Sequence, residues 1–268
     1  MILERPRLGG TQHGELDLVF EARAGKTVLV KSFQKPPLLI VRPFELEPGV
    51  LTVIVVNPTA GILAGDTYKI SVTLQPEARV VLLTQSATKI HKMNDSLSAQ
   101  QEIQFQVSEN ARLEYYPERT IPYAFSNFKQ NLRVDLEAGA EFGLLETWTT
   151  GRVLRGERLE FTKYAARIEV RISHKLEYLD SFNLEPQKAN LNGLGALEGH
   201  DYIASGFFVG QQSELPKLEH ISTGLTANNN LWLRAVAKNA PDLDRNIINA
   251  RDTLRAALFG AGKLEMRR

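Results

Sequence analysis

The sequence predicts a mainly β fold, in which stacked strands form a β-helix-like single domain that ends in two C-terminal α-helices. Apolar and polar residues alternate through most of residues 15–182, a degenerate repeat returns within this region, and helical spacing replaces the alternation near the end of the chain. We expect a single domain over residues 1–268, with a β-rich core over about 10–222 and a helical part over about 228–260.

The composition is that of a globular protein and argues against several functional classes. Lys and Arg number 32 against 31 Asp and Glu, and this near neutrality disfavours nucleic-acid binding through a basic face. The absence of cysteine rules out disulfides, thiolate zinc sites and a Cys nucleophile. No apolar run approaches the roughly 18–20 residues of a membrane span, and the first residues lack the pattern of a signal peptide. We therefore expect a cytoplasmic protein that binds neither membranes nor nucleic acid.

Period-two alternation identifies individual strands of the β-rich core. Three segments show it most clearly, because polar or charged residues separate their apolar ones. Successive side chains of a strand point to opposite faces, so each segment is expected to bury one face. The apolar residues are Ile103, Phe105 and Val107, then Phe128, Leu132, Val134 and Leu136, and then Ile168, Val170 and Ile172.

A degenerate repeat organises the middle of this region. Residues 72–83, 105–116 and 134–145 each consist of an expected strand, a four-residue turn and a second strand, at offsets of 33 and 29 residues. The turns carry Pro, Asn or Gly, as turn geometry requires. Such a period in β-structure predicts stacked layers, as in a solenoid. A sandwich built from repeated hairpins would give the same pattern, and both architectures stay open.

Each copy of the repeat runs into a polar segment after its second strand. These segments contain Thr84, Glu118 and Glu146. If the copies stack in register, the three segments gather at one edge of the stack or along an internal passage. Neighbouring carboxylates there would attract a divalent cation, and an incomplete set of oxygen ligands would hold it only briefly.

The last part of the chain is predicted to form two helices. Apolar residues of the segment 231–237 have roughly helical spacing and follow possible N-caps at residues 228–230. A second helix is expected to begin at Pro241 and to end at Gly260. Its apolar stripe is larger than a terminal helix needs, and we expect it to bind a protein partner. The stripe consists of Leu243, Ile247, Leu254 and Leu258.

A Gly-rich loop over residues 57–66 lies between two expected strands. Its glycines permit positive φ and close backbone approach. It lacks the Lys-Ser/Thr pair and the following helix of a phosphate-binding loop. It is either a long hairpin turn or a functional loop, and its notable residues are Asn57, Gly61, Gly65 and Asp66.

The sequence contains no recognisable motif for catalysis or for tight metal binding. The five histidines lack the spacing of a metal site, and no Ser lies in a GxSxG motif. We therefore expect no catalytic residue and no tightly bound cofactor. The pairs Glu118–Arg119 and Arg152–Glu157 are typical of surface ion pairs. Glu146 lies in an apolar strand and requires a partner, for which Arg152 is the candidate.

Four motifs occur in order along the chain, at residues 57–66, 83–91, 113–121 and 150–157. Together with the segments 35–44 and 250–255 near the two ends, they cover nearly the whole chain. The ordered set resembles the UreD family of urease accessory proteins, which is also called UreH.

This resemblance implies a chaperone-like maturation factor that is not itself an enzyme. The family acts with an all-helical UreF-type protein and a UreG-type GTPase on the urease apoprotein, and it helps to install nickel in the active site. GTP hydrolysis would belong to the partner GTPase, and this chain would touch Ni²⁺ only transiently. The implied fold is a β-rich stack of strands with two helices.

The resemblance also marks residues of a polar interior or an interface. Asp66, Glu118 and Glu146 are candidates for a transient nickel path. An alternative class stays open, namely a hydrolase or lyase on a β-solenoid that uses paired carboxylates such as Glu118 and Glu146. The other motif and interface candidates are Asn57, Gly61, Gly65, Thr84, Gln85, Thr88, Lys89, Arg119, Gly151, Arg152 and Glu157.

Overall fold

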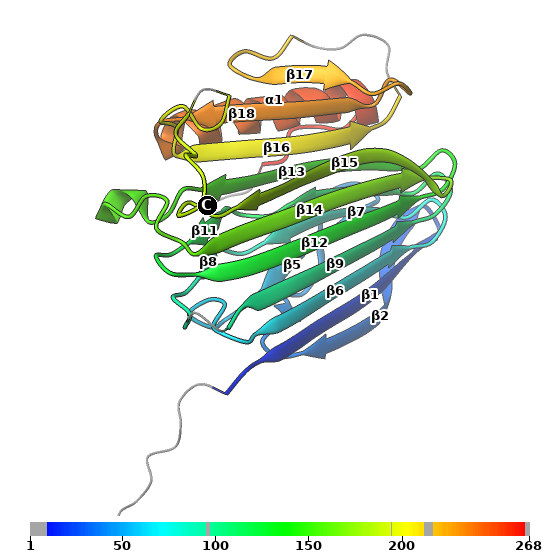
Figure 1. The fold of residues 1–268 in the computed structure, drawn as a ribbon. Coiled ribbons are helices and arrows are strands. Elements are labelled where there is room, and N and C mark those ends of the chain that lie inside the picture. Colours follow the sequence, from blue (N-terminus) through cyan, green and yellow to red (C-terminus); the bar gives the residue numbers. More distant parts are fainter. Residues whose placement is uncertain (1–9, 95–96, 194, 212–216, 266–268) are drawn as a thin grey trace, which may run out of the picture.

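The computed structural model describes residues 10–94, 97–193, 195–211 and 217–265. In this part of the chain two β-sheets face each other, and one long α-helix lies behind the second sheet (Figure 1). The prediction of a mainly β, β-helix-like stack is confirmed.

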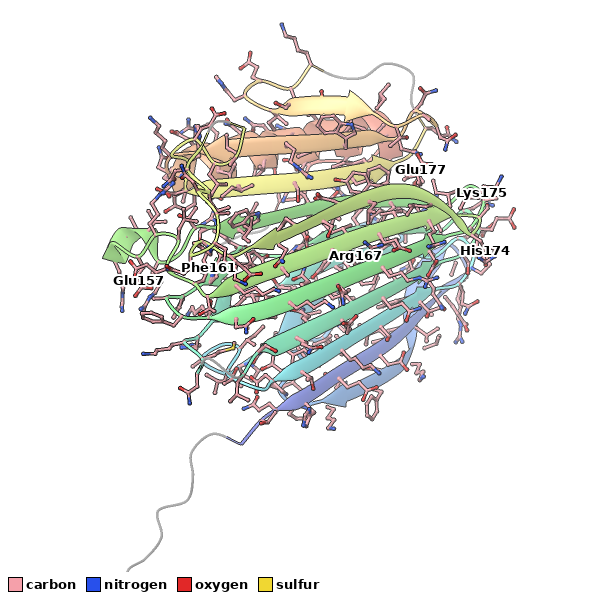
Figure 2. The ribbon with its side chains drawn as sticks, in the orientation of Figure 1. Glu157, Phe161, Arg167, His174, Lys175 and Glu177 are labelled. Atoms are coloured by element: carbon pink, nitrogen blue, oxygen red, sulfur yellow. The ribbon has the colours of Figure 1, made fainter. Side chains whose placement is uncertain are left out.

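The first sheet has an inner face that packs on the second sheet and an outer face that is polar. Arg167 lies on this outer face (Figure 2). The inner strands are parallel to their neighbours, and the strands at the two edges are antiparallel to theirs. In spatial order the strands are β15 (Lys175–Leu184), β14 (Lys163–Ile172), β12 (Asn127–Leu136), β9 (Ala99–Val107), β6 (Thr67–Leu74), β1 (His13–Arg23) and β2 (Lys26–Lys35).

The second sheet continues into the C-terminal part of the chain. Its main path, in spatial order, is β17 (Ser222–Leu225), β18 (Leu231–Ala237), β16 (Tyr202–Val209), β13 (Glu141–Thr149), β10 (Arg112–Tyr116), β7 (Arg79–Thr84), β5 (Val50–Val56) and β3 (Leu39–Ile40). Three short strands join this sheet off the main path, namely β4 (Phe44–Glu47), β8 (Thr88–Ile90) and β11 (Thr120–Pro122).

The internal repeat corresponds to the coils of the stack. In each copy the first strand lies in the first sheet and the second strand lies in the second sheet, so the copies are not hairpins and the hairpin sandwich is wrong. Val72 pairs with Phe105 and Phe105 with Val134, which reproduces the sequence offsets of 33 and 29. Each connecting turn has one residue with positive φ at the equivalent position: Glu77, Asn110 and Gly139.

Short segments cover one end of the stack, which we call the loop end. It consists of residues 57–66, 85–94, 117–126 and 150–162, and the last segment contains the 3-10 turn η1 (Val153–Arg155). Backbone pairing connects these segments in order, because Ile62 pairs with Ile90 and β8 pairs with β11. In Figure 1, η1 projects beyond the sheets at this end.

The predicted first C-terminal helix is wrong, because residues 231–237 form strand β18. Burial in this segment has a period of two, since Leu231, Leu233, Ala235 and Ala237 are buried and the residues between them are more exposed. Pairing with β16 selects the strand, and Asn228 to Asn230 therefore cap no helix. A single α-helix, α1 (Ala240–Phe259), is present within the described residues.

Helix α1 has the boundaries that the sequence indicates. The Asn239 side chain accepts a hydrogen bond from the Asp242 backbone N–H, Pro241 lies in the first turn, and Gly260 ends the helix at φ 58°. The apolar stripe, however, is not a free partner surface. Leu243, Leu254 and Leu258 are buried and Ile247 is partly buried, because they pack on the outer face of the second sheet.

Candidate functional site

A row of polar side chains lies between the two sheets, in an interior that is otherwise apolar. Gln101 and Gln130 are direct neighbours in the first sheet, and Glu146 and Ser205 are direct neighbours in the second. Thr84 lies at the end of β7, beside Val55 of the neighbouring strand. The strand alternation directs all five side chains inward, between positions that hold buried apolar residues.

Two adjoining cavities follow this polar row, and a third lies on the other side of the second sheet; we call the three together the polar passage. The first, of about 80 Å³, and the second, of about 30 Å³, share Thr84, Thr88 and Gln101 as lining residues. The third, of about 80 Å³, lies between the second sheet and α1 and shares Glu118 and Thr147 with the second. A water molecule needs about 10–15 Å³ on this scale, so each cavity can hold water or a partly dehydrated ion.

Glu146 lines the second cavity from the inner face of β13, and the exposed Glu118 lines it as well. Glu146 Oε1 accepts a hydrogen bond of 2.7 Å from Gln130 Nε2. Burial raises the pKa of Glu146 to about 7, and the charge of Asp180 acts in the same direction. The prediction that Arg152 pairs with Glu146 is wrong, since Arg152 pairs with Glu157 at the loop end. An amide therefore holds this carboxylate, and it can exchange a proton near neutral pH.

Asp66 organises the Gly-rich loop. Its carboxylate accepts hydrogen bonds from the backbone N–H groups of Gln12 and Leu63, both at 2.8 Å, and from the Tyr68 hydroxyl at 3.0 Å. Asp66 is buried, and it is not among the residues that line the three cavities. The structure therefore separates Asp66 from Glu118 and Glu146, which both line the second cavity.

Two of the remaining loop residues, Asn57 and Gly61, line the first cavity. Asn57 Oδ1 accepts hydrogen bonds from the backbone N–H and the hydroxyl of Thr59. At Gly61 a Cβ atom would lie 2.4 Å from the carbonyl oxygen of Lys89, so only glycine fits there. Gly65 has a φ of +83°, and a Cβ atom would lie 3.0 Å from Thr11 Oγ1. The loop is therefore a built wall of the cavity and not only a turn.

The candidates of the segments 84–89 and 118–119 lie at the junction of the cavities. Thr84 Oγ1 accepts a hydrogen bond of 2.8 Å from the backbone N–H of Glu118. Gln85, Thr88 and Lys89 line the first cavity. The expected ion pair between Glu118 and Arg119 is absent from the described residues, because Arg119 pairs with Asp244 of α1.

Gly151, Arg152 and Glu157 hold the last loop of the loop end in one shape. Arg152 Nε donates to Glu157 at 2.7 Å, and this hydrogen bond lowers the pKa of Glu157. Gly151 has a φ of +147°, and a Cβ atom there would lie 2.6 Å from the carbonyl oxygen of Glu157. The predicted Arg152–Glu157 ion pair is confirmed.

The site offers oxygen and amide groups and no preformed metal cage. Among the residues that the structure describes, no group of three or more His, Asp or Glu side chains could hold a metal ion. No helix in the same part of the chain is long and apolar enough to cross a membrane. The side chains along the polar passage offer hydroxyl, amide and carboxylate groups.

Comparison with known proteins decides the family. A sequence model of the UreD urease accessory protein family matches residues 12–268. The chain belongs to the UreD family. It is 44% identical over 266 residues to the urease accessory protein UreD of Deinococcus radiodurans, which covers 96% of this chain and 95% of the relative. It is 38% identical to the UreD of Acetivibrio thermocellus, over 71% of this chain and 73% of that relative.

More distant members of the UreD family align over almost the full length as well. The UreD of Actinomyces naeslundii is 29% identical over 95% of this chain and 98% of the relative. The resemblance based on four ordered motifs is therefore confirmed. The relatives are named as accessory proteins of urease, which agrees with a protein that is not itself an enzyme and carries no support for the hydrolase or lyase alternative.

Sequence reasoning missed Gln101, Gln130 and Ser205, which line the second cavity. A signal for two of them was present. Gln130 interrupts the inward row between Phe128 and Leu132, and Gln101 occupies the inward position two residues before Ile103. A polar residue at an inward position of an alternating strand requires a buried partner or a cavity.

Proposed function

We propose that this chain is a chaperone-like urease maturation factor that helps to deliver nickel into the urease active site. Membership of the UreD family supports the maturation role. The proposal extends this role to the passage of Ni²⁺ through the chain, in the cytoplasm and together with a UreF-type helical protein, a UreG-type GTPase and the urease apoprotein.

The single observation that carries the nickel proposal is the polar passage itself. Three cavities lie in series between the loop end and the groove beside α1, and neighbouring cavities share lining residues. The proposal requires that they open into one another. Thr84, Gln101, Gln130 and Glu146 offer oxygen atoms along this route. Hard or borderline divalent cations bind such groups, and an incomplete ligand set releases them readily.

The proposal requires that Glu146, in the second cavity, changes its charge by losing and taking up a proton. In the absence of the cation, its raised pKa of about 7 allows the carboxyl group to hold a proton and to remain neutral beside Gln130. An arriving divalent cation favours the ionised form, so the proton leaves as the cation binds. When the cation moves on, proton uptake restores the neutral group.

The volume of the second cavity limits how many water molecules a cation can retain there. The second cavity of about 30 Å³ has room for about two water molecules, which is less than the full hydration shell of a divalent cation. The cation therefore exchanges part of its water shell for the hydroxyl and amide oxygens of the wall. In this proposal the chain itself hydrolyses no nucleotide and retains no cofactor.

The test is co-expression of urease structural proteins and the partner proteins, either without this chain or with one of three versions of it. The versions are the wild type, Glu146→Gln and the control Glu102→Gln, which changes an exposed carboxylate on the outer face of β9. We expect the wild type and the control to load urease with nickel equally. We expect Glu146→Gln to assemble into the same complexes and to load less nickel per active site. Equal loading by Glu146→Gln would contradict the nickel path, whereas loading without this chain would contradict the maturation role.

A further inference from the structure

Leu154 is the most exposed large apolar side chain among the described residues, with an exposed fraction of 96%. It lies at the tip of η1, which projects from the loop end (Figure 1). Glu157, which closes the same loop, is labelled there in Figure 2. A single exposed leucine is ordinary on a protein surface. Leu154 differs from an ordinary exposed leucine in three respects: its loop is closed by several contacts, a second exposed apolar residue belongs to the neighbouring segment, and positively charged side chains lie at the same end.

The loop that presents Leu154 is rigidly built. Arg152 and Glu157 close it by an ion pair, and the backbone N–H of Leu159 donates to the carbonyl of Thr150 at 2.7 Å. At Gly151 the backbone has a φ of +147° and leaves no room for a Cβ atom beside the carbonyl oxygen of Glu157. An ordered loop loses little conformational entropy when a partner binds its tip. These contacts close the base of the loop from which Leu154 projects.

A second exposed apolar residue, Phe125, belongs to the neighbouring segment of the loop end. It is 51% exposed, and Lys92 Nζ lies 4.8 Å from the centre of its ring. The two segments are connected, because the backbone N–H of Phe125 donates to the carbonyl of Glu160 and that of Ala124 donates to the Glu157 carboxylate. Leu154 and Phe125 are thus two apolar side chains on one connected surface.

The charge around these two side chains is positive. Lys89, Lys92 and Arg155 are exposed at the loop end, and none of the ion pairs found among the described residues includes them. The exposed carboxylates of the same segments are only Glu118 and Glu160, within the residues that the structure describes. A complementary surface would surround an apolar socket with carboxylates.

We propose that Leu154, Phe125, Lys92 and Arg155 form a docking surface for the urease apoprotein, which presents an apolar socket ringed by carboxylates. This inference rests on the proposed function, because the protein that binds the surface is the urease apoprotein, which receives the nickel in that function. The first cavity of the polar passage is lined by Gln85 and Lys89 of the same loop end. The proposed surface therefore lies at the end of the stack where this cavity is found. Docking at this position shields a leaving cation from bulk water.

The test measures binding of the full-length chain to purified urease apoprotein. Leu154→Asp removes the apolar tip, and Leu176→Asp is the matched control, because Leu176 is 51% exposed on the edge strand β15. We expect Leu154→Asp to weaken binding about tenfold or more, as for a central interface residue, while Leu176→Asp binds like the wild type. Arg155→Glu should weaken binding as well, and more strongly at low salt. The thermal midpoint of every variant is measured, and all three substitutions affect exposed side chains.

Three results would overturn the assignment of this surface. One is wild-type affinity of Leu154→Asp for the apoprotein. Another is self-association of the wild-type chain that Leu154→Asp abolishes, measured by sedimentation, and the third is binding of the wild type to anionic phosphatidylserine vesicles that the same variant loses. The proposed function is tested separately: if the wild type activates urease and Leu154→Asp activates it equally, only the docking surface fails.

Discussion

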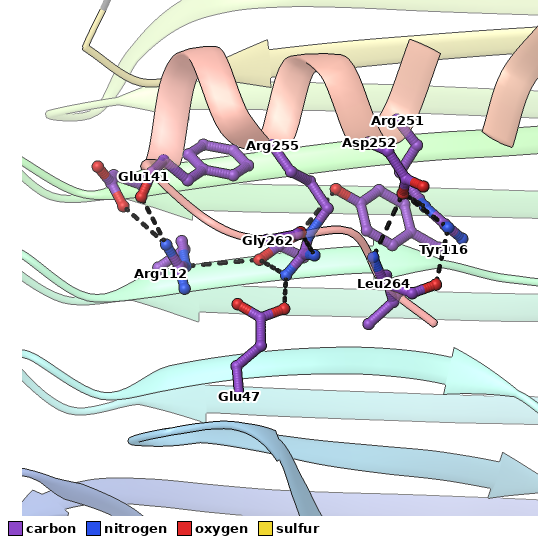
Figure 3. A network of polar contacts seen from close by, with 11 residues as sticks. Glu47, Arg112, Tyr116, Glu141, Arg251, Asp252, Arg255, Gly262 and Leu264 are labelled. Carbon is purple, nitrogen blue, oxygen red and sulfur yellow. Dashed lines mark hydrogen bonds and ion pairs between the residues drawn. The ribbon is translucent and has the colours of Figure 1, made fainter. Parts of the chain in front are cut away.

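Arg255 of α1 donates a hydrogen bond through Nε to Glu114 of β10 at 2.5 Å, and both side chains are fully buried. This contact joins the helix to the middle of the second sheet across 141 residues of sequence. Glu47 and the carbonyl of Gly262 also accept hydrogen bonds from Arg255, and Tyr116 donates one to Glu114 (Figure 3). The network fixes the position of α1 on the sheet, whereas the apolar contacts alone would permit several positions.

Loss of Arg255 should destabilise the whole chain. Arg255→Met leaves the Glu114 carboxylate buried with only Tyr116 and Arg112 beside it, and we expect a loss of about 3–5 kcal/mol in the free energy of unfolding. Urea denaturation measures this loss. Arg245→Met serves as the control, because Arg245 is exposed on the same helix, and it should cost less than about 0.5 kcal/mol. Recovery of stability in the double variant Arg255→Met/Glu114→Leu would show that the Glu114 carboxylate, which has lost its ion pair with Arg255, causes the loss.

The apolar stripe of α1 should act on stability and not on partner binding. Leu254 is fully buried, so Leu254→Ala should lower the free energy of unfolding by about 2–5 kcal/mol. Leu179→Ala on an exposed position of β15 should change it by less than about 0.5 kcal/mol. Removal of all residues after Asn230 deletes β18 and α1 together and should leave an aggregating chain. A folded, monomeric product of this truncation would contradict the packing of α1 on the sheet.

The raised pKa of Glu146 predicts how stability depends on pH. Its pKa is about 7 in the folded chain and about 4.3 in an unfolded one, so the folded state binds more protons between these values. The contribution of Glu146 to stability therefore falls as the pH rises from about 4.5 to about 7, and it is constant above that range. Urea midpoints of the wild type and Glu146→Gln, measured from pH 5 to pH 8, isolate this contribution as their difference. A difference that does not change with pH would contradict the burial of a titrating carboxyl group.

The two glycines of the last loop should respond differently to alanine. Gly151→Ala meets the carbonyl oxygen of Glu157 and adopts a φ of +147°, so we expect a loss of about 2–3 kcal/mol in the free energy of unfolding. Gly156 has a φ of +82° and open space around it, so Gly156→Ala should cost only about 1 kcal/mol. Thermal unfolding compares the two variants. An equal loss in both would show that the crowded contact at Gly151 relaxes without cost.

The sequence pattern predicted the architecture because each coil of the stack repeats the same order of strand, turn and strand. The offsets between Val72, Phe105 and Val134 set the register of the parallel strands directly. The sequence pattern failed at Leu231 and Leu233, where a short apolar segment fits both periods and only pairing with β16 decides between them. The division into a single domain stays a prediction.

The site was less accessible to sequence reasoning, because side-chain partners depend on contacts between distant segments. Arg152 lies six residues after Glu146, yet the end of β13 separates them and Glu157 lies closer to Arg152 in space. Asp66 accepts hydrogen bonds from backbone N–H groups of its own loop and of Gln12. Residue spacing in the sequence does not predict such contacts. Gln130 could have been found, since it breaks the apolar row of its own strand.

The parallel register of β9 and β12 also sets a fixed step along the wall of the passage. Gln101 and Gln130 occupy paired positions on adjacent strands, and such strands lie about 4.8 Å apart. The two amide side chains therefore start from backbone positions one strand spacing apart and point to the same side of the sheet. On the proposed nickel path, an ion that crosses the coils would meet ligands at intervals set by this spacing. If the chain conducts an ion in this way, an additional coil would add one ligand position to the route and would leave the distance between positions unchanged.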